Sequence, residues 1–108
     1  MEGLFVVRDG AEAIDYLAGK VVYADRSLYP FPDLMLLDLS MPRRNGFEVL
    51  EWWKSARRPE HLTTIVLTGS PSREDVERAY KLGAASYLRK PAHLAEVIEL
   101  ARRVLVVS

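Results

Sequence analysis

Three residues with different side-chain chemistry follow strand-like apolar runs in this sequence. Asp38 ends the run LMLLD, Thr68 ends TIVLT, and Lys90 follows SYLR. A carboxylate beside a hydrophobic core is unfavourable unless another group pairs with it or a reaction uses it. An aspartate can attack phosphorus and form an acyl phosphate, while lysine and threonine can bind the phosphoryl oxygens. The three residue types therefore suit a site that accepts a phosphoryl group.

Each of these residues has an ordinary structural explanation when it is taken alone. Asp38 could cap a helix or a loop, Thr68 could be a simple strand residue, and Lys90 could be a solvated side chain. Their conjunction favours the functional interpretation, because three separate strand ends would otherwise supply complementary groups by chance.

Strand-like and helix-like segments alternate along the chain. We expect strands at Leu4–Val7, Leu34–Leu39, Thr64–Thr68 and Ala85–Leu88. We expect helices at Ala11–Ala18, from Phe47 to about Arg57, from Ser70-Pro71 to Gly83, and from His93 to about Arg103. This alternation predicts an α/β fold with a doubly wound parallel sheet. In such sheets functional groups collect beyond the carboxyl ends of the strands, where Asp38, Thr68 and Lys90 would converge.

The composition is that of one soluble globular domain covering residues 1–108. The chain is 49% hydrophobic and 28% charged, and its 15 basic and 15 acidic residues balance. No net field therefore favours nucleic acid or an anionic membrane. The chain has no cysteine, no secretory leader in MEGLFVVRDG, and no apolar run near the ~18 residues of a membrane span. We expect a cytoplasmic protein with no nucleic-acid or membrane partner.

The spacing around Asp38 resembles that of the receiver domains of two-component response regulators. In that family a proline and a glycine follow the phosphorylated aspartate at four and eight positions, as Pro42 and Gly46 do here. A threonine or serine follows at thirty positions, an aromatic residue at forty-nine and a Lys-Pro pair at fifty-two; the matching residues are Thr68, Tyr87 and Lys90-Pro91. The stretches VVRDGAEAIDYL, LDLSMPRRNGFEVL and SYLRKP most resemble single-domain regulators paired with phytochrome-type kinases. The implied fold is flavodoxin-like.

The resemblance implies a role for each matching residue. Asp38 would accept the phosphoryl group from a histidine kinase and Lys90 would pair with that group, so the chain would be a signalling module and not an enzyme. Thr68 would move toward a phosphoryl oxygen, and Tyr87 would move with it and change a distant surface. The peptide bond before Pro91 would be cis, as in the family.

The amino terminus departs from the family pattern. A complete receiver begins with a strand that ends in two acidic residues and continues into a helix before the equivalent of FVVRDG. This sequence starts near the second strand, so the first βα unit and the acidic pair are missing from it. Magnesium prefers several anionic oxygen ligands, and only Asp38 and the backbone carbonyl of Ser40 are left to bind it. We expect weak or absent Mg²⁺ binding and impaired phosphorylation.

The missing strand also raises a structural question. In the family strand order 2-1-3-4-5 the first strand is central, so its loss would leave a gap and expose apolar surface on one sheet face. The first strand of this chain could move into the gap, two chains could associate, or the tail VLVVS (Val104–Ser108) could fill the gap as a strand. We expect the tail to complete the last helix instead. In each case we expect a homodimer that buries the uncovered face.

Two functions of other classes stay open. In the first, the chain is a natural or engineered receiver remnant that is not phosphorylated and acts as a dimerisation or interaction module. The family motif is intact from Asp38 onward, but the metal site is incomplete, and this imbalance favours that function. In the second, the chain is a phosphohydrolase with an aspartate nucleophile. Those enzymes place a second aspartate two residues after the first, and Ser40 at that position argues against them. A flavodoxin-type flavin site is weaker still, since the cradle-like TGSPS follows a later strand.

Overall fold

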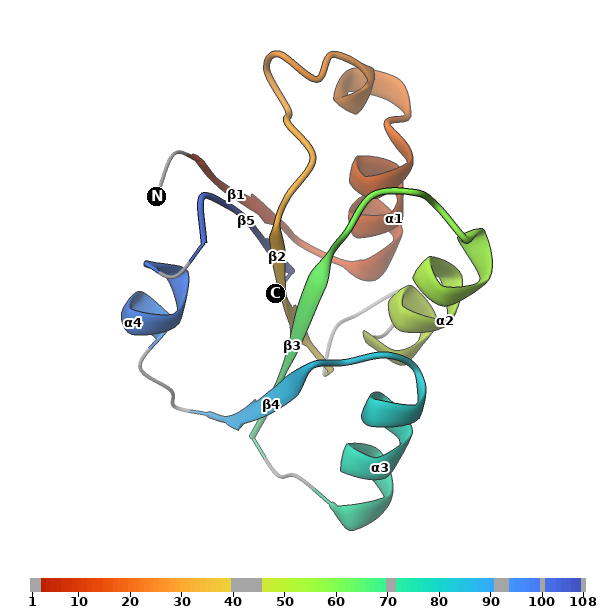
Figure 1. Cartoon of the computed structure of the whole chain (residues 1–108), viewed down its shortest axis with the longest axis vertical. Helices are drawn as coiled ribbons and strands as arrows, with labels where there is room; N and C mark the ends of the chain where they lie inside the picture. Colours follow the sequence, from red (N-terminus) through yellow and green to blue (C-terminus); the bar gives the residue numbers. More distant parts are fainter. Residues whose placement is uncertain (1–2, 40–45, 70–71, 91–93, 100, 108) are drawn as a thin grey trace.

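Five parallel strands form one sheet in the order β1-β5-β2-β3-β4 (Figure 1). The computed structural model describes residues 3–39, 46–69, 72–90, 94–99 and 101–107. The elements in chain order are β1 (Gly3–Val7), α1 (Gly10–Ala18), the short 3₁₀ helix η1 (Val21–Ala24), β2 (Leu34–Asp38), α2 (Gly46–Ala56), β3 (Thr63–Thr68), α3 (Arg73–Lys81), β4 (Ser86–Arg89), α4 (Leu94–Ile98) and β5 (Arg103–Val107). The predicted α/β fold with a parallel sheet is confirmed.

Local signals in the sequence account for most element boundaries. In β2 the residues of LMLLD are buried on both faces of the sheet, as a continuous apolar run predicts. Helix α1 begins at the cap Asp9, whose carboxylate accepts a hydrogen bond from the Glu12 N–H at 2.8 Å. It ends at Gly19, which has a φ of 69° and therefore favours glycine. The predicted strands and the first two helices are confirmed to within about two residues.

The predicted start of α3 is wrong. The helix begins at Arg73, and its cap is Ser72, whose side-chain oxygen accepts a hydrogen bond from the Asp75 N–H at 3.1 Å. The stretch SPS contains two serines that could cap the helix, and the sequence alone favoured the first because the proline after it suits a first helical turn. Ser70 and Pro71 lie outside the described residues.

The two faces of the sheet are covered unequally. Helices α1, α2 and α3 lie on one face, and the short α4 lies on the other (Figure 1). The first face holds the larger hydrophobic core, which includes Tyr16, Leu17, Met35, Leu50 and Leu105. The second face holds a smaller cluster built on Leu34, Leu36, Leu67 and Val104. The sheet is therefore well buried where the helices that follow β1, β2 and β3 pack against it.

The prediction that the tail completes the last helix is wrong. Helix α4 ends at Ile98, and residues Arg103–Val107 form β5, which pairs in parallel with both β1 and β2. Val104, Leu105 and Val107 are fully buried there. The β-branched tail fits a central strand well, and the strand satisfies the inner main-chain groups of both neighbours. β5 thus occupies the sheet position that the family order assigns to the first strand.

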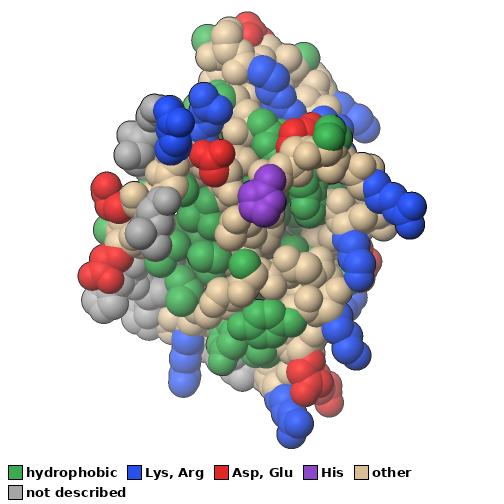
Figure 2. Space-filling view, viewed as in Figure 1, with side chains coloured by type: hydrophobic (Ala, Val, Ile, Leu, Met, Phe, Trp, Pro, Cys, Tyr) green, Lys and Arg blue, Asp and Glu red, His purple; other side chains and the backbone are tan. Residues whose placement is uncertain are grey.

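The uncovered part of the second face exposes apolar side chains, as predicted. Leu4 and Val6 on β1 are 43% and 61% exposed. A groove of about 390 Å³ lies beside α4 and is lined in part by Leu34, Ile65 and Val97. Figure 2 shows hydrophobic side chains gathered at the surface over this region, next to α4. The structure contains a single chain, so the homodimer stays a prediction.

The connection from α1 to β2 is held by an aromatic cluster. The ring of Tyr16 lies 4.8 Å from that of Tyr23 and 6.1 Å from that of Tyr29, measured between centroids. Arg26 donates hydrogen bonds to the carbonyl oxygens of Tyr16 and Leu17 at 2.8 and 3.0 Å, at the end of α1. Burial raises the pKa of the Tyr16 hydroxyl to about 12.

Among the described residues, no helix has the length and hydropathy needed to cross a membrane.

Candidate functional site

Asp38 lies at the carboxyl end of β2, with Lys90 beside it. The Asp38 residue is only 9% exposed, and its carboxylate Oδ2 accepts a hydrogen bond from the ammonium group of Lys90. This contact is also an ion pair, and the Lys90 side chain is 41% exposed. The pair joins residues that are 52 positions apart in the chain. The structure therefore brings together the carboxylate and the ammonium that the sequence placed at separate strand ends.

The backbone holds Lys90 at the end of the neighbouring strand. Its N–H donates a hydrogen bond to the carbonyl oxygen of Thr68 at 2.8 Å. Thr68 is the last residue of β3 and is 7% exposed. Because β3 lies between β2 and β4, Thr68 sits at the same edge of the sheet as Asp38 and Lys90. The structure thus places Asp38, Thr68 and Lys90 at one edge of the sheet, and their roles there stay predictions.

The close approach of α2 to β2 explains a motif residue that the sequence could only match by position. A Cβ atom added at Gly46 would lie 2.8 Å from the Leu39 Cδ2 and 3.1 Å from the Asp38 carbonyl oxygen. The first distance is shorter than real Cβ contacts, and the second would force the Asp38 backbone to give way by a few tenths of an ångström. Glycine therefore lets the first turn of α2 pack directly on the backbone that carries Asp38. The N–H of Leu39 also donates to the Leu67 carbonyl oxygen at 3.1 Å, which extends the β2–β3 pairing past Asp38.

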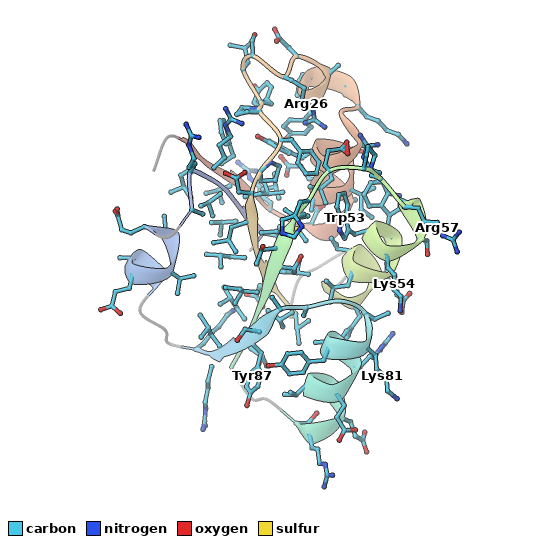
Figure 3. The ribbon with its side chains drawn as sticks, in the orientation of Figure 1. Arg26, Trp53, Lys54, Arg57, Lys81 and Tyr87 are labelled. Carbon is cyan, nitrogen blue, oxygen red and sulfur yellow. The ribbon has the colours of Figure 1, made fainter. Side chains whose placement is uncertain are left out.

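Tyr87 lies on β4 and faces α3 (Figure 3). It is 38% exposed, and its ring packs edge-on against the ring of Tyr80 at a centroid distance of 6.2 Å. In the β3–β4 pairing Tyr87 is opposite Val66, two residues before the Thr68–Arg89 pair. A hollow of about 390 Å³ separates Tyr87 from the first turns of α3 and is lined by Ser72, Arg73, Val76 and Glu77. The ring thus lies at the surface, one strand away from the buried Thr68.

Among the described residues, Asp38 is the acidic side chain at the candidate site that could bind magnesium. No group of three or more His, Cys, Asp or Glu side chains that could hold a metal is present in the part of the chain that the structure describes. Asp38 is the acidic residue at the candidate site, and its carboxylate is paired with Lys90. A Mg²⁺ ion completes its octahedral shell of oxygen ligands with water and holds the protein through one or two carboxylates, so Asp38 would be the acidic ligand that the described residues offer. Two predicted features, the Ser40 carbonyl ligand and the cis bond before Pro91, lie outside the described residues.

Comparison with known proteins gives a consistent result. The family model of the response regulator receiver domain matches residues 3–102. The response regulator Rcp1 of Synechocystis is 33% identical over 97 residues, which cover 90% of this chain and 64% of Rcp1. A probable cyclic di-GMP phosphodiesterase of Vibrio cholerae is 39% identical over 77 residues, which cover 71% of this chain and 17% of that protein. The chain thus spans less than two thirds of the length of these curated relatives.

Solved structures agree with this assignment. The phosphorylated cyanobacterial phytochrome response regulator RcpA superposes with a TM-score of 0.73 at 28% identity, and the match covers 94% of this chain and 89% of RcpA. The Mn²⁺-bound form of Rcp1 superposes with a TM-score of 0.69 at 25% identity, covering 94% and 90% of the two chains. The chain belongs to the response regulator receiver domain family, the phosphoaccepting modules of two-component signalling.

Proposed function

We propose that Asp38 accepts a phosphoryl group from the phosphohistidine of a histidine kinase. The observation that carries this proposal is the ion pair between Asp38 and Lys90 at the carboxyl edge of the sheet. Asp38 is mostly buried but lies at a strand end, and a nucleophile in that position can be reached from the crevice beyond the sheet. Membership in the receiver family supports the same role.

The chemistry requires one bond to form and one to break. A carboxylate oxygen of Asp38 attacks the phosphorus atom, the bond from phosphorus to the donor nitrogen breaks, and the electron pair of that bond stays on the histidine. The product is an aspartyl phosphate. We propose that the ammonium of Lys90 turns from the carboxylate to the new phosphoryl oxygens, and that the Thr68 hydroxyl donates a hydrogen bond to one of them.

We also propose that Thr68 and Tyr87 transmit the change to the surface. Thr68 ends β3 and is buried beside the site, while Tyr87 is half exposed on the neighbouring strand. A shift of the Thr68 side chain toward a phosphoryl oxygen would free space on the β4 side, and the hollow between Tyr87 and the first turns of α3 gives the ring room to move. The surface of α3 and β4 is then the part of the molecule that changes on phosphorylation.

The weak metal site sets the expected rate. Phosphoryl transfer develops negative charge that Mg²⁺ normally neutralises, and the described residues provide one carboxylate for it. We infer that the chain binds Mg²⁺ weakly and is phosphorylated slowly, with Lys90 as the main cation at the site. Cytoplasmic location and the absence of an enzymatic activity stay predictions. The match to the Vibrio phosphodiesterase covers too little of that protein to carry its activity over.

The test is intact-mass analysis during incubation with acetyl phosphate, with and without Mg²⁺. We expect slow addition of one phosphoryl group, a small acceleration by Mg²⁺, and no addition to an Asp38→Asn variant. Lys90→Ala should lower the labelling rate by at least about tenfold, because one positioned cation is removed from the phosphoryl oxygens. A complete receiver labelled in parallel confirms that the reagents are active.

A specific observation favours a second function, a receiver-type binding module that is not phosphorylated. Asp38 and Lys90 form an ion pair, while the described residues contain no group of three or more side chains that could hold a metal. If the chain takes up no phosphoryl group after prolonged incubation while the complete receiver is labelled, the phosphoacceptor proposal is wrong and this second function holds. Labelling that persists in Asp38→Asn would also contradict the proposal, because the acceptor would be another residue.

A further inference from the structure

We propose that two copies of this chain associate through their β1 strands, which pair antiparallel across a two-fold axis at Phe5. The proposal names the surface by which the molecule recognises a second copy of itself, and it does not depend on phosphorylation of Asp38. It rests on two independent properties of the same two residues, Leu4 and Val6: the direction of their main-chain groups and the exposure of their side chains.

The main-chain argument starts from the pairing of β1 with β5. Gly3 is opposite Arg103, and its N–H donates to the Arg102 carbonyl oxygen at 3.0 Å, so the main-chain groups of Gly3 point toward β5. Alternate residues of a parallel strand bond to the same neighbour. Gly3, Phe5 and Val7 therefore face β5, and the N–H and C=O groups of Leu4 and Val6 point away from the sheet. β1 is an edge strand, and among the described residues no hydrogen bond is made to those outward groups.

The edge has none of the usual features that prevent strand pairing along its described length. β1 reads GLFVV, without a proline or a charged residue. The first main-chain group beyond it is already occupied, because the Arg8 N–H donates to the Glu12 carboxylate at 3.1 Å. Within the described part of the edge, the outward groups of β1 are those of Leu4 and Val6, and we take these as the length of the interface.

The side chains support the same surface. Leu4 and Val6 project from the sheet face that carries only α4, and they are 43% and 61% exposed. Phe5 projects from the other face, where its ring packs against Tyr16 at a centroid distance of 5.8 Å. A partner that pairs with the edge therefore also covers the exposed apolar side chains, while the aromatic cluster stays as it is.

A second copy satisfies these groups in one register. If Leu4 is opposite Val6 of the partner subunit, symmetry places Val6 opposite the partner's Leu4. Each such pair exchanges two N–H···O=C bonds, so the four outward groups of each copy are used. The two-fold axis then passes between the Phe5 residues of the two chains. On the open face the four aliphatic side chains lie in directly opposed pairs, the arrangement that stabilises antiparallel strands. An unrelated partner would need its own edge strand with outward main-chain groups and apolar side chains at the matching positions.

The interface is small, so the association should be weak. A five-residue edge buries less than the ~1,200 Å² found in stable complexes, and we expect a dissociation constant on the order of 100 μM. Sedimentation equilibrium between about 10 μM and about 1 mM covers this range. Val6→Lys should raise the dissociation constant by at least about tenfold, because it places two like charges at the paired edges. Val22→Lys is the matched control, since Val22 is 60% exposed on η1, away from β1.

Engineered cysteines test the register. The chain has no cysteine of its own, so introduced thiols are the only ones present. Leu4→Cys and Val6→Cys proteins mixed together should form a disulfide-linked heterodimer, because directly opposed residues have Cα atoms about 5.5 Å apart. Each variant alone should form far less, because equivalent residues of the two chains are offset along the strands by two positions.

These outcomes separate the proposal from its competitors. A protein that is monomeric over the whole range, or a dimer unaffected by Val6→Lys, overturns pairing through β1. A Leu4→Cys protein that crosslinks to itself as readily as the mixture overturns the register. Failure of Asp38 to accept a phosphoryl group leaves these results unchanged, so the two proposals fail independently.

Discussion

The two halves of the sheet are assembled differently. In the half made of β2, β3 and β4, the strands follow one another in the chain, and each delivers a site residue to the same edge. In the half made of β1 and β5, the first and last strands of the chain pair with each other and supply no residue to the Asp38–Lys90 pair. The first half carries the candidate chemistry, and the second completes the core. The candidate site is thus built on strands that are consecutive in the sequence, while the sheet that holds them is completed by strands from the two ends of the chain.

The largest expected effect comes from a cavity in the half of the sheet made of β1 and β5. Leu105 on β5 is fully buried in the larger core, and Leu105→Ala should lower the free energy of unfolding by about 2–5 kcal/mol. Urea denaturation followed by circular dichroism measures the change. Leu28→Ala is the control, because Leu28 is 64% exposed and its loss should change stability by less than about 0.5 kcal/mol. Equal effects of the two variants would mean that the tail is not a central strand.

In the half made of β2, β3 and β4, the addition of a single methyl group should also lower the stability of the protein. Gly46→Ala forces a methyl group against Leu39 and the Asp38 carbonyl, and we expect a loss of about 1–3 kcal/mol in the free energy of unfolding. The labelling rate of Asp38 should also fall, since the backbone that carries the carboxylate must shift. Gly69→Ala is a matched control, because no atom lies within 4 Å of a Cβ added there. A Gly46→Ala protein as stable as the control would show that α2 does not pack this closely on β2.

The smallest expected effect concerns pH and the aromatic cluster beside β1. The pKa of Tyr16 rises from 10.0 in the unfolded chain to about 12 in the folded protein, with burial as the main cause. The folded state therefore holds this proton more tightly. The stabilisation is complete below pH 10 and is lost as the pH rises from 10 toward 12. Urea denaturation at several pH values should show a steeper loss of stability above pH 10 in the parent protein than in Tyr16→Phe.

The Tyr16→Phe variant also provides a reference at lower pH. The Tyr16 hydroxyl donates a hydrogen bond to the Pro30 carbonyl oxygen at 2.9 Å, so the variant should be less stable by about 1 kcal/mol at pH 8. That difference should shrink as the pH passes through 10 to 12. A constant difference across this range would mean that the Tyr16 hydroxyl is not buried as the structure places it.

Sequence patterns predicted the strands β2, β3 and β4 well, because each of these strands is defined by a short run of neighbouring residues. The apolar run before Asp38, the β-branched run before Thr68 and the strand before Lys90 each define a strand end, and parallel strands share one edge. The predicted convergence needed no knowledge of which segments meet elsewhere. The geometry of Gly46 was not predictable in this way, because the close contact depends on the position of α2 against β2.

The tail shows what the sequence by itself could not determine. The residues of RRVLVV are compatible with the last turn of a helix and with a strand, and helical continuity from His93 favoured the wrong choice. The outcome depends on an unpaired position between β1 and β2, where main-chain groups and apolar side chains of both neighbours would otherwise stay unsatisfied. Residue types and spacing determined the fold class and the receiver family. Only the tertiary structure decided which segment fills the sheet, because that choice is made by long-range pairing and burial.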